Sequence, residues 1–320
     1  MITGNPSNYQ LMPICKIVVV VFALVFTRDL MAQEFISLWP PGKKPNFNGK
    51  TVSDTLYNER IWRVGQPGVY AFVLPKQENT GTAVLICPGG GYERISHLYN
   101  GFNLARWYNS IGVSAFVLIY RLPHQQDLVN RQLAPLQDAQ RAMKLIRANA
   151  GKWNIQRNKI GVMGTSAGGH LASMLGTRND DVSAIRDPFD TVAFRPDFLV
   201  LLSPVISMGP LAHRGSRRHL MGTDTSKAML DKYSSELQVS TFTPPTFLVH
   251  AQDDSTVMVQ NSLVFYNSLL AARINASLHV FPQGGHGIRL DQNPGSTDLW
   301  MELLEKWLKE MDFVIPVPFK

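Results

Sequence analysis

The sequence predicts an α/β protein in which helices cover both faces of one mainly parallel sheet. The main observation is an alternation that starts at residue 69, where short runs rich in β-branched and apolar residues are followed by longer stretches at helical spacing. Such alternation is typical of parallel strands joined by crossover helices. A second observation is size, since 320 residues with 45% apolar and 17% charged side chains suit one domain with a large core. We therefore expect residues 33–320 to form a single domain.

The individual elements follow from this pattern. Strands are expected at residues 69–74, 83–87, 114–120, 160–163, 198–202, 246–251 and 277–281. Helices are expected at residues 101–111, 135–150, 166–175, 260–272 and 297–311. In the helix at 135–150 the apolar residues form one stripe, with Arg141, Lys144 and Arg147 largely opposite, so this helix is expected to lie on the sheet. Residues 204–245 are polar and turn-rich and predict a short polar excursion above the sheet.

The first 32 residues have the pattern of a signal peptide. Lys16 precedes an unbroken apolar run at 17–26, and Ala32 offers a small residue for cleavage. A membrane anchor is the weaker alternative, because this run is about half of the roughly 20 residues that a spanning helix needs. Met12 is an alternative start. We expect a secreted or periplasmic protein with no stable membrane span.

Cysteine content and charge exclude several classes of protein. Cys15 lies in the expected signal peptide, so the remaining Cys87 cannot form an internal disulfide, which is compatible with a periplasm or cell surface. We expect Cys87 to be a small buried residue and not a reactive thiol. The net charge of +7 is spread along the chain, without a basic repeat that alternates with aromatic residues. We therefore expect no nucleic-acid partner.

The segment 160–170 combines a strand, a Gly-Thr-Ser-Ala-Gly turn and a helix start. In this G-x-S-x-G arrangement, the serine occupies a sharp turn, and glycines two residues before and after it avoid Cβ clashes with the neighbouring backbone. Ser166 would then lie at a helix N-terminus, where free N–H groups favour developing negative charge. Ser166 is the expected nucleophile. The alternative is a chance match to a common pattern.

A glycine run, Gly89-Gly90-Gly91, follows the buried-type strand at 83–87. Such a run leaves backbone N–H groups uncovered, which suits an oxyanion hole. We expect Gly90 and Gly91 to supply this hole together with the N–H of Ala167. A flexible turn is the alternative.

A serine nucleophile needs a base and an acid, which in this arrangement follow in the order serine, acid, histidine. The strand at 246–251 leads to two adjacent acids, Asp253 and Asp254, and His286 stands between glycines after the next strand. The order and the intervals fit a triad of Ser166, His286 and one of these acids.

The other histidines have simpler interpretations. His170 follows Ser166 by one helical turn and is expected to pack inside with hydrogen bonds to the backbone. His250 and His279 lie in predicted strands, where a core or surface residue is the default. A metal site made of His250 and the two acids lacks a supporting His or Cys pair. We expect no metal and no other cofactor.

Several segments resemble the bacterial carbohydrate-esterase branch of the α/β-hydrolases, which includes acetylxylan esterases. The segments that carry the resemblance are PGGGY at 88–92, AFVLIYRLP at 115–123, APLQDAQRA at 134–142, GTSAGGHLAS at 164–173, SPVISM at 203–208, HRGSR at 213–217, HAQDD at 250–254 and GGHG at 284–287. The resemblance implies an α/β-hydrolase fold with one catalytic domain at 33–320. It also implies that Asp254 is the acid, because the acid-x-x-valine spacing of the family fits only from Asp254.

The implied substrate is an acetylated oligosaccharide or polysaccharide. The polar character of the 204–245 excursion agrees with a sugar better than with the apolar lid of a lipase. We expect Tyr92, His213 and Arg217 to contact the substrate. Arg214, Arg217 and Arg218 could together meet a sugar acid, and a solvated or structural cluster is the alternative.

Two other functions remain open at this point. The same triad could hydrolyse feruloyl, peptide-like or other acyl groups, because a triad does not choose the acyl group. A catalytically inactive binding protein would require the loss of a triad residue or a glycine, and none is lost here. Within the esterase interpretation, we expect a preference for short acyl groups.

Overall fold

The structure is a computed structural model that describes residue 1 and residues 33–315. The expected signal peptide therefore lies outside the described residues except for Met1. The described residues from Gln33 onward belong to one compact unit. In this part of the chain, no helix is both long enough and apolar enough to cross a bilayer.

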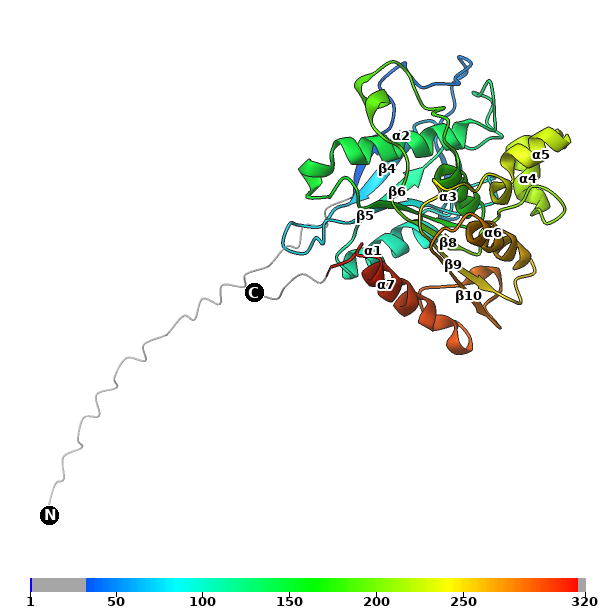
Figure 1. The fold of residues 1–320 in the computed structure, drawn as a ribbon. Coiled ribbons are helices and arrows are strands. Elements are labelled where there is room, and N and C mark those ends of the chain that lie inside the picture. The colour runs from blue at the N-terminus through cyan, green and yellow to red at the C-terminus, as the bar shows by residue number, and fades with distance from the viewer. Residues whose placement is uncertain (2–32, 316–320) are drawn as a thin grey trace. The chain divides into compact units, whose positions relative to one another are not determined.

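An eight-stranded sheet forms the centre of this unit (Figure 1), with the strand order β1-β4-β6-β5-β7-β8-β9-β10. The six strands from β6 to β10 in this order are parallel, and β4 and β1 extend the sheet in antiparallel fashion. The bounds are β1 Glu34–Ser37, β4 Gly68–Phe72, β5 Ala83–Cys87, β6 Ser114–Ile119, β7 Ile160–Thr165, β8 Leu199–Leu202, β9 Thr246–Ala251 and β10 Ala276–Phe281. The predicted mainly parallel sheet is confirmed.

Two hydrophobic cores lie on opposite faces of the sheet, because successive strand residues point to opposite sides. In β5, Leu85 belongs to one core, whereas Val84 and Ile86 belong to the other. The first core is covered by α2 (Ala134–Ala148), α3 (Ala167–Thr177) and α6 (Gln260–Ala271). The second core is covered by α1 (Asn103–Ser110) and α7 (Trp300–Glu310). Figure 1 shows α2 on one side of the sheet and the pair α1 and α7 on the other.

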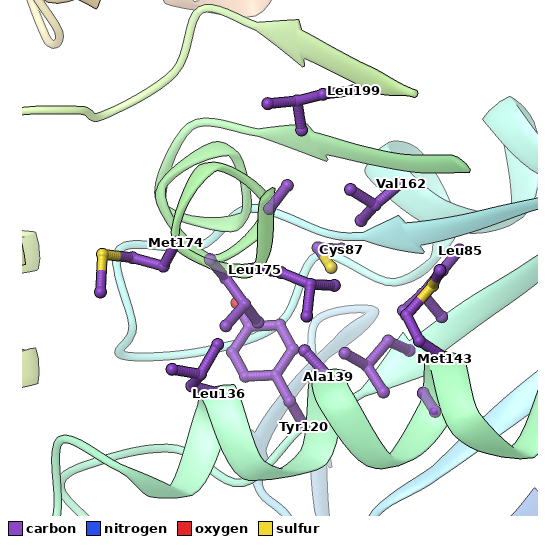
Figure 2. Close-up of a cluster of buried hydrophobic side chains, with 14 of the residues drawn as sticks. Leu85, Cys87, Tyr120, Leu136, Ala139, Met143, Val162, Met174, Leu175 and Leu199 are labelled. Atoms are coloured by element: carbon purple, nitrogen blue, oxygen red, sulfur yellow. The ribbon is translucent and has the colours of Figure 1, made fainter. Parts of the chain in front are cut away.

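The first core fixes α2 and α3 against the strands that carry the site (Figure 2). Apolar side chains of α2 meet residues of β5, β7 and β8 and the side chains of Met174 and Leu175 from α3. Cys87 is fully buried in this core, and burial raises the pKa of its thiol. The carboxyl ends of β5 and β7 are thereby held in place.

The face of α2 that carries the basic residues is buried as well, whereas the polar face of a helix packed on a sheet is usually exposed to solvent. The chain at 178–197 covers this face, and it provides a carboxylate for each of three basic residues. Arg141 pairs with Asp187, Lys144 with Asp181 and Arg147 with Asp197, at nitrogen–oxygen distances of 2.5, 2.5 and 2.9 Å.

Strand β5 lies between β6 and β7, although the chain visits these strands in the order β5, β6, β7. After β5 the chain therefore adds β6 on one side of β5 and then crosses to add β7 on the other side, which reverses the direction in which strands are added. In sheets of this type, ligands bind outside the carboxyl ends of the strands at such a reversal.

Three further segments lie around this edge. A hairpin of β2 (Thr55–Tyr57) and β3 (Arg60–Arg63) is connected to the site loop through a bridge between Ile61 and Ile95. The predicted excursion contains two short helices, α4 (Arg214–Met221) and α5 (Lys227–Tyr233), for which the sequence pattern gave no specific prediction.

Candidate active site

The turn between β7 and α3 holds Ser166 in an unusual backbone conformation. Its φ is 56° and its ψ is −122°, a region that L-residues rarely adopt. Glycines make the turn sterically feasible. A Cβ on Gly164 would lie 2.1 Å from the carbonyl oxygen of Gly168, and a Cβ on Gly168 would lie 2.0 Å from that of Cys87. The serine hydroxyl is therefore held at the carboxyl end of the sheet, immediately before a helix.

A hydrogen-bonded chain connects Ser166, His286 and Asp254. His286 Nε2 lies 2.8 Å from Ser166 Oγ, and His286 Nδ1 lies 2.8 Å from Asp254 Oδ2. A carboxylate only accepts hydrogen bonds, so Nδ1 donates to Asp254 and Nε2 of the neutral imidazole accepts from the Ser166 hydroxyl. The site is therefore arranged to transfer a proton from the serine to the histidine.

The environment of Asp254 keeps its carboxylate ionised. Burial by itself would raise the pKa of Asp254, but hydrogen bonds from His250, His286 and the N–H of Val257 hold it well below the ordinary value. The second oxygen, Oδ1, accepts from the N–H groups of Thr256 and Val257, both at 2.9 Å. The carboxylate thus stays ionised and is also held in one position.

His250 contacts Asp254 directly, which the sequence did not indicate. This fully buried β9 residue places Nε2 2.8 Å from the carbonyl oxygen of Val257 and 3.3 Å from Asp254 Oδ2. Its Nδ1 lies 2.8 Å from the hydroxyl of Ser262. The four-residue spacing from His250 to Asp254 was visible in the sequence, but the strand pattern alone favours an ordinary core histidine.

Asp253 points elsewhere. Its Oδ1 accepts a hydrogen bond of 2.7 Å from the N–H of Gly285, the residue before His286. The two adjacent acids therefore contact different parts of the histidine loop: Asp254 the imidazole and Asp253 the backbone.

The glycine loop after β5 lies beside the serine. A Cβ on Gly89 would approach Ser166 Cβ to 3.2 Å, and Gly90 and Gly91 line the same cavity as Ser166. Among the described residues, none accepts a hydrogen bond from the N–H of Gly90, Gly91 or Ala167. These donors are therefore available to a ligand at the serine.

The serine opens into a polar cavity of about 530 Å³. Its walls come from the tip of the β2–β3 hairpin, the loop after β5, helix α4 and the His286 loop. They carry the charged residues Glu59, Arg60, Glu93, Arg94 and Arg218.

The three expected sugar contacts have different positions. His213 lines the cavity and caps α4, where its Nδ1 accepts from the N–H of Ser216. Tyr92 is only 1% exposed and its hydroxyl lies 2.8 Å from His170 Nδ1, so its side chain points into the core. The guanidinium of Arg217 donates to the carbonyl oxygens of Met208 and Gly209 and does not line the cavity. The predictions for Tyr92 and Arg217 are corrected accordingly.

Two cavity residues were missed. Thr165 is the last residue of β7, Ser203 follows the end of the neighbouring strand β8, and both line the cavity with Ser166. Among the described residues, neither buried hydroxyl has a hydrogen-bond partner. Ser203 also has a positive φ of 44°, which no sequence signal indicates for serine.

His170 is packed inside as expected. Its Nε2 lies 2.7 Å from the carbonyl oxygen of Tyr233, and burial lowers its pKa to about 4. In the described part of the chain, no group of three His, Cys, Asp or Glu side chains is placed to hold a metal ion.

Comparison with known proteins places this site in context. The BD-FAE family model matches residues 72–269. The chain is 33% identical over 250 residues to an acetylxylan esterase of Xylanibacter ruminicola, with 77% of this chain and 48% of that protein covered. It is 34% identical over 243 residues to endo-1,4-beta-xylanase B of Butyrivibrio fibrisolvens, with 72% and 38% covered. The chain thus spans less than half the length of both curated relatives.

A solved structure is similar along nearly its whole length. The acetyl ester-xyloside bifunctional hydrolase from Caldicellulosiruptor lactoaceticus is 38% identical, with a TM-score of 0.77. The match covers 88% of this chain and 98% of that one.

Proposed function

Since the chain belongs to the BD-FAE family of α/β-hydrolases, we propose that it is a serine esterase that removes acetyl groups from carbohydrates. The observation that carries the proposal is the connected geometry from Asp254 through His286 to Ser166, with both hydrogen bonds at 2.8 Å. In this proposal Ser166 is the nucleophile, His286 the general base and Asp254 the residue that orients the histidine.

Acylation begins when Ser166 Oγ attacks the carbonyl carbon of the ester while His286 Nε2 takes the hydroxyl proton. The carbonyl oxygen becomes an oxyanion, which the N–H groups of Ala167, Gly90 and Gly91 would stabilise. Asp254 stabilises the protonated imidazole. When the tetrahedral intermediate collapses, the bond to the sugar oxygen breaks, and that oxygen takes the proton from His286 and leaves as an alcohol.

Deacylation repeats these steps with water. His286 takes a proton from a water molecule, which attacks the acetyl carbon on Ser166. Collapse of the second intermediate returns the proton to Ser166 Oγ and releases acetate. No cofactor enters this cycle, because every proton transfer uses His286.

The proposed substrate class has two supports. The first is similarity to the acetylxylan esterase and to the acetyl ester-xyloside hydrolase. The second is the cavity itself, in which charged side chains from several segments surround Ser166 and suit a polar leaving group better than a lipid. The preference for acetyl over longer acyl groups is part of the proposal, because a tightly packed niche rejects added methylenes.

The test measures two series of reactions. Acetate release is measured from acetylated xylan, acetylated pectin and small acetylated sugars, and kcat/KM is measured for 4-nitrophenyl esters from acetate to octanoate. We expect acetate release from at least one sugar ester and a kcat/KM that falls as the acyl chain lengthens. Rates that rise with chain length, together with no acetate from any sugar ester, would contradict the proposal.

We also propose that the protein acts outside the cytoplasm. The support is the sequence pattern of Lys16, the apolar run at 17–26 and Ala32. N-terminal sequencing of the protein recovered from the medium or periplasm tests this proposal. A cytoplasmic protein that retains its first residues would contradict it.

A further inference from the structure

A second cavity, of about 660 Å³, adjoins the cavity that contains Ser166. The two cavities share part of their walls, and we refer to them together as the cleft. The shared residues are Arg60, Tyr99, Asn100, Leu202, Gly287 and Ile288. None of the proposed catalytic residues lines the second cavity, and the reaction at Ser166 does not require it.

The boundary between the cavities is formed by an unusual helical turn. Residues Leu98–Phe102 form a π-helix, in which the N–H of Phe102 donates to the carbonyl oxygen of His97 at 2.8 Å. π-helical turns are rare in proteins, and those that do occur are often found at functional sites. Phe102 anchors the turn against Phe72 and Tyr70, each at a ring-centroid distance of 5.1 Å.

The turn also lies directly on the sheet. A Cβ on Gly101 would lie 2.6 Å from the Val117 side chain, so only glycine permits this close approach. The turn is thereby held rigidly, with Tyr99 45% exposed at the cleft. Asn100 lies toward the serine, because a Cβ on Gly89 would contact both Asn100 Oδ1, at 3.4 Å, and Ser166 Cβ, at 3.2 Å.

The lining of the second cavity combines two kinds of surface. Its apolar part consists of the exposed ring of Tyr99, the fully buried Trp300, whose Nε1 donates a hydrogen bond of 2.7 Å to the carbonyl oxygen of Arg289, and the aliphatic residues Leu104, Leu202, Ile288 and Leu290. Around them are the amides and charged groups of Asn100, Asn103, Arg60, Arg289 and Asp291. Charges of both signs are present, so the lining does not select a polyanion.

This combination fits a sugar ring. A pyranose has an apolar C–H face, which packs on an aromatic ring, and a rim of hydroxyls, which bond to amides, carboxylates and guanidinium groups. We propose that the second cavity is a subsite for a pyranose unit next to the acetylated unit, with Tyr99 as its stacking platform and Asn100 between the subsite and Ser166. This inference rests on the proposed function and deepens it by assigning the place where a neighbouring unit of the carbohydrate chain binds.

Binding without turnover provides the direct test. Calorimetry is performed with the Ser166→Ala protein and two unacetylated probes, xylotetraose and cellotetraose. We expect at least one of them to bind, and adding Tyr99→Ala should weaken that binding about tenfold because the stacking surface is lost. Tyr99→Phe keeps the ring and should bind nearly as well as the parent. The matched control is Tyr57→Ala, since Tyr57 is 64% exposed on the hairpin and lines neither cavity.

Kinetics give a second readout on the protein with Ser166 intact. Tyr99→Ala should lower kcat/KM for acetylated xylotetraose by a larger factor than kcat/KM for 4-nitrophenyl acetate, which has no neighbouring sugar unit, whereas Tyr57→Ala should change neither. The subsite would be overturned if neither probe bound. It would also be overturned if Tyr99→Ala and Tyr57→Ala lowered the binding affinity or kcat/KM by the same factor. If Tyr99→Ala lowered kcat/KM only for 4-nitrophenyl butyrate or methyl ferulate, the second cavity would instead bind the acyl group. That result would also overturn the subsite. Failure of the proposed function would look different, because the wild type would then release no acetate from any sugar ester, whatever the unacetylated probes do.

Discussion

His250 Nε2 lies 3.3 Å from Asp254 Oδ2, the oxygen that also accepts the hydrogen bond from His286. Two histidines on different segments therefore contact one carboxylate oxygen. The carbonyl oxygen of Val257 can only accept a hydrogen bond, so His250 Nε2 carries a proton, which faces Val257 and Asp254. His250 is thus placed to position the acid of the triad.

We predict that His250→Phe lowers kcat and leaves KM nearly unchanged. A hydrogen bond to a charged group contributes about 1.5–3 kcal/mol, which corresponds to a loss of roughly tenfold to a hundredfold. The pKa of Asp254 should rise without this donor, so the stability that the ionised carboxylate contributes should be lost at a higher pH than in wild type, which thermal melts at low pH measure. His279→Phe on β10 is the matched control. Equal kcat values and the same pH dependence of the melting temperature in the two variants would show that His250 only fills space.

The adjacent acids Asp253 and Asp254 should differ strongly in their effect on rate. Asp254→Asn places an amide against His286 Nδ1 and should lower kcat by about 10⁴, because the histidine is then held in the wrong tautomer. Asp253→Asn keeps an oxygen that can accept from the N–H of Gly285, so we expect less than about a tenfold loss. Steady-state kinetics of the two variants decide the assignment, and the reverse ranking would overturn it.

The close backbone contact at Gly168 predicts a further pair of variants. Gly168→Ala would place a Cβ 2.0 Å from the carbonyl oxygen of Cys87, so the turn and the loop after β5 must separate. We expect a lower melting temperature and almost complete loss of activity. Gly151→Ala is the control, because its Cβ would meet nothing within 4 Å. If Gly168→Ala kept wild-type stability and rate, the described packing of the two loops would be incorrect.

The lowered pKa of Asp254 predicts how stability depends on pH. The ordinary value is 3.8, and the folded value lies below it. The ionised carboxylate therefore stabilises the fold fully above the ordinary value, and this contribution disappears as the pH falls toward the folded value. Asp254→Asn should be less stable than wild type near neutral pH and should lose less stability between about pH 5 and pH 3. Thermal melts across this range measure both effects, with Asp253→Asn as control, and parallel curves for wild type and Asp254→Asn would contradict the prediction.

The core elements were readable from the sequence because burial determines their composition. The strands Ala83–Cys87 and Thr246–Ala251 coincide with their predicted ranges, since every residue in them is buried. The start of the helix predicted at 101–111 differs from that of α1, Asn103–Ser110. The reason is the preceding π-helix, which depends on the contact between Gly101 and Val117 across the fold and leaves no local pattern.

Side-chain directions in the site were harder to predict. Tyr92 follows the glycine run, but its φ of 58° and its bond to His170 direct the ring inward. Arg217 belongs to a short helix that the polar composition of the excursion concealed. The spacing of Ser166, Asp254 and His286 was informative because chain order and strand ends determine which residues meet at one edge of a parallel sheet. The contact of His250 with Asp254 depends on how the chain turns after β9, which the spacing does not reveal.

The central claim is that Ser166 is a nucleophile activated by His286. Incubation with a fluorophosphonate, followed by intact-mass measurement and peptide mapping, tests it most directly, because such probes modify only an activated serine. We predict one adduct per chain, located on Ser166, which is absent in Ser166→Ala and much slower in His286→Ala, while Asp253→Asn reacts normally. An adduct on another residue, or ester hydrolysis that persists in Ser166→Ala, would contradict the account.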